Sequence, residues 1–321
     1  MNVLLVGGFG YLGGRLATGL RARGHEVIVA GRRVKERPHQ SDPSQPAFRV
    51  EKVDVLSDPM VLAEVMARTA TEVVVDLAAL DEIEAIRDPD LALRVSSEGV
   101  RKLLAAAKVS GNPRFVFLST FHVYGATFPP AIDEDTATKA SHPYAISHLA
   151  GEGYCRESNR TGGPVSVALR LSNGYGCPAD LSVDRWTLAH NDFCRQAVEK
   201  RGIVLSSSGT QRRDIVWMDD VAEAVDLVMK APSESLGEAI FNVGGGKTVT
   251  IFELATVVSA RAEKLFGRPV PVTRPSAGTP SPDFAFSIER LRALGFSPKD
   301  RLVEETDQLL ARLEAAHASA S

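Results

Sequence analysis

The sequence predicts an α/β protein built on a doubly wound parallel sheet, with a smaller lobe toward the C-terminus. The first observation is an apolar run from Asn2 to Val6, which ends in a glycine-rich turn at Gly7 to Gly14. The next segment, Arg15 to Arg23, has apolar residues at helical spacing, and Val27 to Ala30 then predicts a second buried strand. Strand, helix and strand in this order form the right-handed crossover from which parallel sheets are built.

The remaining chain repeats this alternation as far as residue 176 and then breaks it. Asp58 and Pro59 supply an N-cap and a first-turn proline for a helix that reaches about Thr69. Further strands are expected over residues 47–53, 72–76, 113–118, 165–170 and 240–243, and further helices over 91–110, from Pro143, around 193–200, over 248–266 and over 300–316. The irregular stretch after residue 176 predicts an excursion into the smaller lobe.

The composition restricts the classes of partner. The chain has 321 residues, of which 44% are hydrophobic and 24% charged, as in globular proteins. A formal net charge of -3 gives no basic footprint, so we expect neither nucleic acid nor a membrane as a principal partner. The three cysteines (Cys155, Cys177 and Cys194) are odd in number and lack metal-ligand spacing, which favours structural thiols in a reducing, cytoplasmic compartment. No metal site is expected.

The glycine-rich turn favours a dinucleotide cofactor. Glycines let the backbone approach a pyrophosphate, whose charge is stabilised by the free N–H groups and the dipole of the helix N-terminus. A tight turn without a ligand is the alternative. After the second strand the chain has Arg32 and Arg33, where an NAD site usually carries an acid for the ribose 2′-hydroxyl. A guanidinium suits the 2′-phosphate of NADP, so NADP is slightly preferred over NAD. The alternative is that both arginines are solvated surface residues that contact no cofactor.

A second candidate site lies on the helix that begins at Pro143. Residues four apart share a helix face, so Tyr144 and His148 project together and could carry out proton chemistry. An ordinary surface helix would explain these two residues equally well. However, Thr120 and His122 follow the strand 113–118, and the carboxyl ends of parallel strands are where such sheets bind ligands.

Taken together, these motifs resemble those of the extended short-chain dehydrogenase/reductase family, the nucleotide-sugar epimerases, dehydratases and ketoreductases. The resemblance covers nearly the whole chain. It implies that the following residues bind the cofactor: Gly7, Gly10, Tyr11, Leu12 and Gly13 of the glycine fingerprint, Asp54 and Val55 at the adenine, Leu77, Ala78 and Ala79 of the cofactor-lining turn, and Tyr144 and His148. The fold is then of Rossmann type with a C-terminal substrate-binding lobe.

The resemblance also implies an activity, hydride transfer at a ring carbon of a nucleoside-diphosphate sugar, as in a 4-epimerase or a 4-ketoreductase. Tyr144 would exchange a proton with the sugar hydroxyl and Thr120 would hydrogen-bond the same oxygen. Asn173, Arg213 and Arg274 would bind the substrate, the arginines through its diphosphate.

Two residues depart from the family pattern. His148 stands where the family has a lysine, and an unprotonated imidazole supplies less positive field to Tyr144. Slower turnover or a shifted pH optimum is expected. Phe121 and His122 replace the acidic pair of the 4,6-dehydratases, which makes dehydration improbable, although His122 can itself serve as a general acid or base. A histidine that is only hydrogen-bonded in its loop is the alternative.

The expected organisation is a Rossmann domain over residues 1–176 with a returning segment at about 209–246. The substrate-binding lobe comprises 177–208 and 247–299, and 300–321 form a C-terminal helix and tail. The resemblance also implies a homodimer that pairs through the helix bearing Tyr144. A catalytically weak or inactive NAD(P)-binding sensor or scaffold on the same fold is the alternative function, because of His148.

Overall fold

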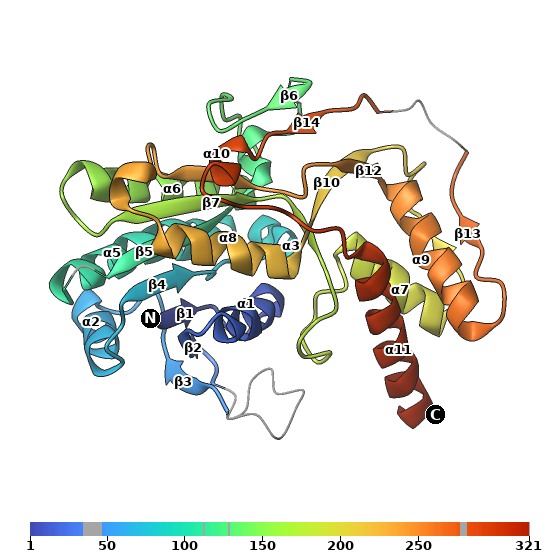
Figure 1. The fold of residues 1–321 in the computed structure, drawn as a ribbon, viewed down its shortest axis with the longest axis horizontal. Helices are drawn as coiled ribbons and strands as arrows, with labels where there is room; N and C mark the ends of the chain where they lie inside the picture. Colours follow the sequence, from blue (N-terminus) through green and yellow to red (C-terminus); the bar gives the residue numbers. More distant parts are fainter. Residues whose placement is uncertain (35–46, 112, 128, 277–280, 321) are drawn as a thin grey trace.

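The computed structural model describes residues 1–34, 47–111, 113–127, 129–276 and 281–320 (Figure 1). Its main sheet has seven parallel strands in the order β11-β7-β5-β4-β1-β2-β3. The strands are β1 (Asn2–Val6), β2 (Glu26–Gly31), β3 (Arg49–Lys52), β4 (Val73–Asp76), β5 (Arg114–Thr120), β7 (Ser166–Leu171) and β11 (Ile240–Val243). The predicted fold class is confirmed. Because the strand order reverses between β1 and β4, a crevice forms outside their carboxyl ends.

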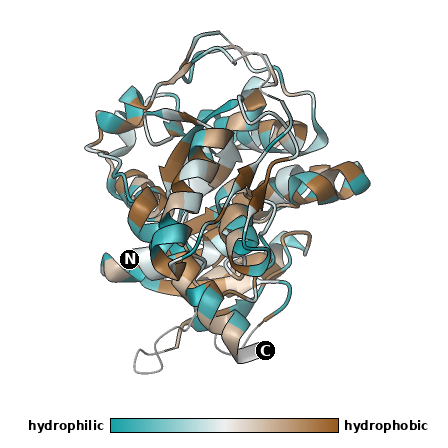
Figure 2. Ribbon diagram, turned by 90° about the vertical axis from the view of Figure 1, so that its right-hand side faces the viewer, coloured by the Kyte–Doolittle hydropathy of each residue, from teal (hydrophilic) through white to brown (hydrophobic). Residues whose placement is uncertain are grey.

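Two helical layers cover the two faces of this sheet. One contains α1 (Tyr11–Ala22) and α8 (Met218–Lys230), and the other α2 (Pro59–Arg68), α5 (Gly99–Val109) and α6 (Pro143–Arg160). Side chains of a strand alternate between faces, so Val3 and Leu5 belong to the core under α1 and α8, and Leu4 and Val6 to the core on the opposite face. Figure 2 shows the resulting pattern: the central strands are largely hydrophobic, and the helices around them combine hydrophobic and hydrophilic residues.

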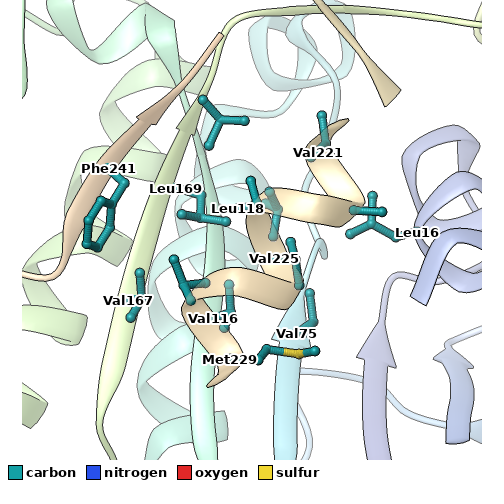
Figure 3. Packing of buried hydrophobic residues seen from close by; sticks show 14 of the residues in the cluster. Leu16, Val75, Val116, Leu118, Val167, Leu169, Val221, Val225, Met229 and Phe241 are labelled. Carbon is teal, nitrogen blue, oxygen red and sulfur yellow. The ribbon is translucent and has the colours of Figure 1, made fainter. Parts of the chain in front are cut away.

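The packing under α8 illustrates why these strands are continuously apolar. Val116 and Leu118 of β5 meet Val225 and Met229 of α8 in one fully desolvated cluster (Figure 3). A sheet covered on both faces has no polar side, so its strands read as apolar runs rather than as alternating ones.

A smaller group of elements packs around a third core. A three-stranded sheet joins β8 (Asn173–Tyr175), β10 (Arg212–Trp217) and β12 (Thr248–Thr250), and β9 (Ile203–Val204) pairs with β13 (Val272–Thr273). Helices α7 (Ala189–Glu199), α9 (Ile251–Phe266) and α11 (Leu302–Ala320) lie together beside them (Figure 1). Phe193, Leu254 and Leu309 are among the buried residues that join these helices.

The short elements complete the fold. They are α3 (Glu82–Arg87), α4 (Pro89–Leu93), a π-helical turn (Arg94–Glu98), 3₁₀ turns at Phe121–Tyr124 and Ser233–Ser235, the strand pair β6 (Ala131–Ile132) and β14 (Ala285–Phe286), and α10 (Glu289–Arg292).

Three predicted elements differ from the observed ones. The helix expected over 91–110 is interrupted by the π-helical turn, which lies so close to α6 that an added Cβ at Gly151 would be 2.4 Å from the Ser96 carbonyl oxygen. The helix expected from Thr248 begins only at Ile251, because residues 248–250 pair with β10 and Thr250 then caps α9. Helix α7 begins at Ala189, earlier than the expected 193.

Candidate active site

A cavity of about 740 Å³ opens outside the carboxyl ends of β1, β2, β4, β5 and β7. It is lined by most of the residues that the sequence singled out, namely Gly7, Gly10, Tyr11, Leu12, Gly13, Arg32, Asp54, Val55, Leu77, Ala78, Ala79, Thr120, His122, Tyr144, His148 and Asn173. Arg33, Arg213 and Arg274 are not among the residues that line it. The chain therefore brings the glycine turn, the hydroxyl of β5 and the Tyr144 helix to one crevice.

The glycine turn has the shape that a pyrophosphate needs. Gly7 has a φ of +79°, and an added Cβ there would lie 2.9 Å from the Ala78 nitrogen. A Cβ on Gly13 would lie 2.5 Å from the Gly8 backbone, so only glycine lets α1 begin this close to the turn. The N-cap residue, Gly10, has no side chain to cap the helix, and the N–H groups of the first turn therefore remain available to an anion. These residues fit the diphosphate of a dinucleotide.

The opposite end of the same crevice suits an adenosine. Val53, Asp54 and Val55 line it beside Arg32, which follows β2. One Asp54 carboxylate oxygen accepts a hydrogen bond from the Leu56 N–H at 3.0 Å, which fixes the turn after β3.

Helix α6 presents Tyr144 through an unusual cap. His142 is the N-cap, and its Nδ1 accepts a hydrogen bond from the Tyr144 N–H at 3.2 Å. Pro143 occupies the first turn, where its missing N–H costs nothing. His142 thus sets the start of the helix and the direction in which Tyr144 leaves it.

Tyr144 lies between Thr120 and His148. The Tyr144 and His148 ring centroids are 4.3 Å apart. Burial raises the pKa of Tyr144, while Arg185 and the nearby Thr120 hydroxyl oppose that rise. Tyr144 is therefore a phenol near neutral pH and can donate its proton.

His148 is held as a neutral ring. Only 2% of the residue is exposed, its ring stacks on Phe117, and burial lowers its pKa to about 4. Its Nδ1 lies 2.7 Å from the Tyr144 carbonyl oxygen. Because a carbonyl can only accept, Nδ1 carries the proton and Nε2 keeps a lone pair. A lysine would bring a positive charge here, whereas His148 offers an uncharged acceptor.

A buried ion pair lies one helical turn beyond His148. Glu152 binds the Arg170 guanidinium of β7 through both oxygens, at 2.9 and 2.8 Å, and accepts a hydrogen bond from the Ser119 hydroxyl at 2.6 Å. Arg170 also donates to the Tyr124 hydroxyl. Ser119 is next to Thr120 on β5 and Glu152 is on α6, so this network fixes the position of α6 relative to the end of β5.

The end of the cavity beyond Tyr144 is charged. The Nε2 atom of His122 lies 2.8 Å from a Glu82 carboxylate oxygen, and Arg185 pairs with Asp81 at 3.3 Å. Sequence reasoning missed Asp81, Glu82 and Arg185. A signal existed for the two acids, because they follow the strand over 72–76 at the ligand-binding edge of the sheet. Arg185 lies in an aperiodic stretch that gave no signal.

Of the remaining predicted substrate residues, Asn173 lines the cavity, whereas Arg213 and Arg274 do not. Asn173 donates a hydrogen bond to the Asp214 carbonyl oxygen at 3.0 Å. Burial lowers the pKa of Arg213, and the Glu82 carboxylate offsets part of that effect. Arg274 donates to the Ser208 carbonyl oxygen and lies 3.6 Å over the Phe252 ring.

Within the described ranges there is no group of three or more His, Cys, Asp and Glu side chains that could hold a metal ion. No helix within these ranges is long and apolar enough to cross a bilayer. All three cysteines are buried and form no disulfide.

The parallel sheet, the glycine turn and the paired hydroxyls define an oxidoreductase of the short-chain dehydrogenase type. Residues 3–244 match the model of the NAD dependent epimerase/dehydratase family, so the chain belongs to this family and is an enzyme. The predicted family resemblance is thereby confirmed.

Its relatives agree with this assignment. The UDP-glucose 4-epimerase of Lacticaseibacillus casei is 26% identical over 322 residues, which are 95% of each chain. A D-erythronate dehydrogenase of Cupriavidus necator is 36% identical over 180 residues, 53% of this chain and 54% of that one. Among solved structures, the UDP-glucose 4-epimerase of Thermus thermophilus in complex with NAD superposes with a TM-score of 0.80 at 26% identity, covering 98% of this chain and 100% of that chain.

Proposed function

We propose that the protein transfers a hydride at C4 of a nucleoside-diphosphate sugar, as a 4-epimerase. The observation that carries this proposal is the convergence of Thr120, Tyr144 and the glycine turn on one cavity in an epimerase/dehydratase family member. Full-length similarity to UDP-glucose 4-epimerases supports the substrate class.

The proton chemistry falls to Tyr144 and Thr120. A bound nicotinamide would accept or donate the hydride at carbon. A carbon–hydrogen bond can yield its hydride only as the attached oxygen loses its proton, so Tyr144 takes that proton, and returns it in the reverse direction. Thr120 hydrogen-bonds the same oxygen and stabilises its developing charge. His148 orients a ribose hydroxyl by accepting its hydrogen bond at Nε2.

The cofactor is NAD or NADP, held by the glycine turn, by Asp54 and Val55, and by the turn at Leu77 to Ala79. Structural relatives with bound NAD support NAD. Arg32 lines the cavity, and in the sequence it stands between Gly31 and Arg33 rather than beside an acid, which supports NADP with Arg33 as a second cation for the 2′-phosphate.

The substrate occupies the end of the cavity beyond Tyr144. Asn173 contributes to its binding, and Arg213 and Arg274 neutralise its diphosphate. Arg274 now stacks on Phe252, so it would leave or extend that contact to reach the substrate.

A 4-ketoreductase is the second candidate, and two observations favour it. Neutral His148 leaves Tyr144 protonated, which suits the delivery of a proton to a ketone oxygen more than the removal of one from an alcohol. Arg32 points in the same direction, because reductases generally consume NADPH.

Absorbance of reduced nicotinamide separates these functions. Incubation with UDP-glucose and catalytic NAD should give UDP-galactose without net reduction of the cofactor if the protein is a 4-epimerase. Net consumption of NADPH with a 4-keto sugar identifies a ketoreductase. A sensor would be stabilised by NAD(P) in thermal denaturation but would respond to no nucleoside-diphosphate sugar.

Three wider features complete the proposal. Residues 1–176, with the returning segment 209–246, bind the dinucleotide, and 177–208 with 247–299 bind the substrate. The three buried thiols suit the cytoplasm. Two copies pair through α6 and its neighbours α3 and α4, where four exposed apolar side chains gather: Ile83, Ile86, Leu93 and Ile146.

A further inference from the structure

The ion pair between Arg185 and Asp81 lies at the end of the cavity beyond Tyr144. Arg185 belongs to the segment between β8 and α7, and its guanidinium is 3.3 Å from a carboxylate oxygen of Asp81, which follows β4. Both residues line the cavity, and 29% and 30% of their side chains are exposed. The proposed hydride transfer assigns no role to this pair.

Both members of the pair are held in place. One Asp81 carboxylate oxygen caps α3 by accepting a hydrogen bond from the Glu84 N–H at 2.8 Å, which leaves the other oxygen for Arg185. The Arg185 carbonyl oxygen accepts a hydrogen bond from the side-chain amide of Asn191, a fully buried residue, at 3.3 Å. Because α3 packs against α6, the guanidinium is held near the helix that bears Tyr144.

The residue after Asp81 connects the ion pair with the surroundings of Tyr144. Glu82 lies 2.8 Å from Nε2 of His122, and the His122 and Tyr144 rings meet edge to face with centroids 6.1 Å apart. The same turn after β4 therefore places one carboxylate against Arg185 and the next against a direct neighbour of Tyr144.

The cations that line the cavity are few. Among the described residues of its lining there is no lysine, and the arginines are Arg32, Arg87 and Arg185. Arg32 follows β2 at the adenosine end, and Arg87 is the last residue of α3. His148, on the same helix as Tyr144, is a neutral ring, because burial lowers its pKa to about 4.

The charges around Tyr144 act on it in opposite directions. Burial raises the pKa of Tyr144, and among the charged groups Arg185 has the largest effect and opposes that rise, whereas Glu82 and Asp81 add to it. A guanidinium stabilises the phenolate, and carboxylates favour the neutral phenol. The other polar and titratable side chains near Tyr144 on the elements around it are Thr120, His122, His142 and His148.

We propose that Arg185, held by Asp81, supplies Tyr144 with the positive charge that His148 does not, and so favours the phenolate that accepts the proton of the sugar hydroxyl. The inference rests on the proposed function, in which Tyr144 is that acceptor. Arg185 acts through Tyr144 and is therefore a positioning residue. Asp81 has two effects, because its contact holds the guanidinium while its own negative charge opposes the phenolate.

The pH dependence of kcat/KM tests the role of Arg185. The measurement is UDP-galactose formation from UDP-glucose with catalytic NAD, whose acid limb reports the ionisation of Tyr144 before the sugar binds. Arg185→Gln should move this limb toward alkaline pH by about one pH unit, the size expected for a charge about 10 Å away at an effective dielectric constant of about 20. Arg185→Lys keeps the charge and should lie near the native limb. An unmoved limb in Arg185→Gln overturns the inference.

Removal of the Asp81 charge should have the opposite sign. Asparagine is as good a helix cap as aspartate, so Asp81→Asn keeps the start of α3 and loses only the charge. Its acid limb should move toward acid pH, by up to about one pH unit. The double variant Arg185→Gln/Asp81→Asn loses one charge of each sign and should lie close to the native limb. A merely structural role would not produce opposite shifts, and shifts of the same sign in the two single variants overturn the inference.

A second ion pair provides the matched control. Arg195 and Asp192 of α7 are 2.8 Å apart, with 35% and 28% of their side chains exposed, and neither is among the residues that line the cavity. Arg195→Gln should leave the acid limb unmoved. A shift as large as that of Arg185→Gln would assign the effect to the net charge of the protein and overturn the inference.

A titration that needs no turnover separates the inference from the proposed function. In protein with ¹³Cζ-labelled tyrosine and bound oxidised NAD, the Tyr144 resonance is assigned from its loss in Tyr144→Phe. Its midpoint should be lower in Asp81→Asn and higher in Arg185→Gln than in the native protein. This order, without reaction of any nucleoside-diphosphate sugar, supports the inference and contradicts the proposed function. Equal midpoints in all three proteins, with epimerisation intact, overturn the inference and leave the proposed function standing.

Discussion

The replacement of His148 by lysine is the most informative single substitution. In the present structure the ring is neutral, with burial lowering the pKa of His148 to about 4, and its centroid lies 4.3 Å from that of Tyr144. His148 therefore supplies no positive charge to Tyr144. His148→Lys would place an ammonium group beside the phenol, one helical turn before the Glu152 carboxylate, which already acts on His148.

The size of the effect follows from Coulomb's law. A charge about 5 Å from the phenol oxygen, at an effective dielectric constant of about 20, stabilises the phenolate by roughly 3 kcal/mol. This corresponds to about two pH units. Oxidation of an alcohol requires the phenolate, so the acid limb of its pH profile should move about two pH units toward acid. The rate at neutral pH should rise by up to about 10²-fold.

The assay is the initial rate of UDP-galactose formation from UDP-glucose, with catalytic NAD, between pH 6 and 10. The other polar side chains that face Tyr144 are Arg185, Asp81, Glu82 and His122. His148→Gln is the control, because it is polar but uncharged, and its acid limb should stay near that of the native protein. An acid limb in the same place for the lysine and glutamine variants would refute the reasoning, provided both variants unfold at a similar temperature.

Three further changes test other parts of the account. Arg32→Glu should lower kcat/KM for NADPH by about 10- to 100-fold through loss of a charged hydrogen bond, and should leave that for NADH within a few-fold. Glu152→Gln should lower the free energy of unfolding by about 3–5 kcal/mol in urea denaturation, because Arg170 stays buried without its carboxylate. Burial raises the pKa of Asp76 to about 7, and the stability of the native protein should therefore fall as pH rises from about 4 to 7. Asp76→Asn should remove up to about 3 kcal/mol of that fall between pH 5 and pH 8, measured by denaturation at both pH values. A larger loss with NADH than with NADPH would contradict the expectation for Arg32→Glu. An unchanged unfolding midpoint in Glu152→Gln would contradict the second expectation, and an unchanged dependence of stability on pH in Asp76→Asn the third.

The main sheet could be predicted because its signals are local. The inner strands are buried on both faces and are therefore short apolar runs, whereas the edge strand β3 is partly exposed. Asp58 and Pro59 mark a helix start that the structure retains. The strand over 248–250 could not be predicted, because it depends on pairing with β10 far away in sequence. The π-helical turn likewise packs closely against Gly151 through Ser96, a tertiary contact that no periodicity encodes.

The candidate site was predictable where chemistry coincides with a strand end, as at Thr120, or with a helix start, as at Tyr144. The protonation state of the His148 ring could not be predicted, because it depends on burial and on the contact with the Tyr144 carbonyl oxygen. Glu82 was missed for a related reason, since only the tertiary structure brings a residue after β4 against His122 after β5.

The central claim, that Tyr144 is the acid/base of a hydride transfer, is tested most directly by single-turnover kinetics of Tyr144→Phe. The sugar-dependent change in nicotinamide absorbance should slow by about 10²- to 10⁴-fold, while binding of NAD(P) and UDP-glucose in thermal denaturation should persist. The native rate in Tyr144→Phe, with both ligands bound, would contradict the claim.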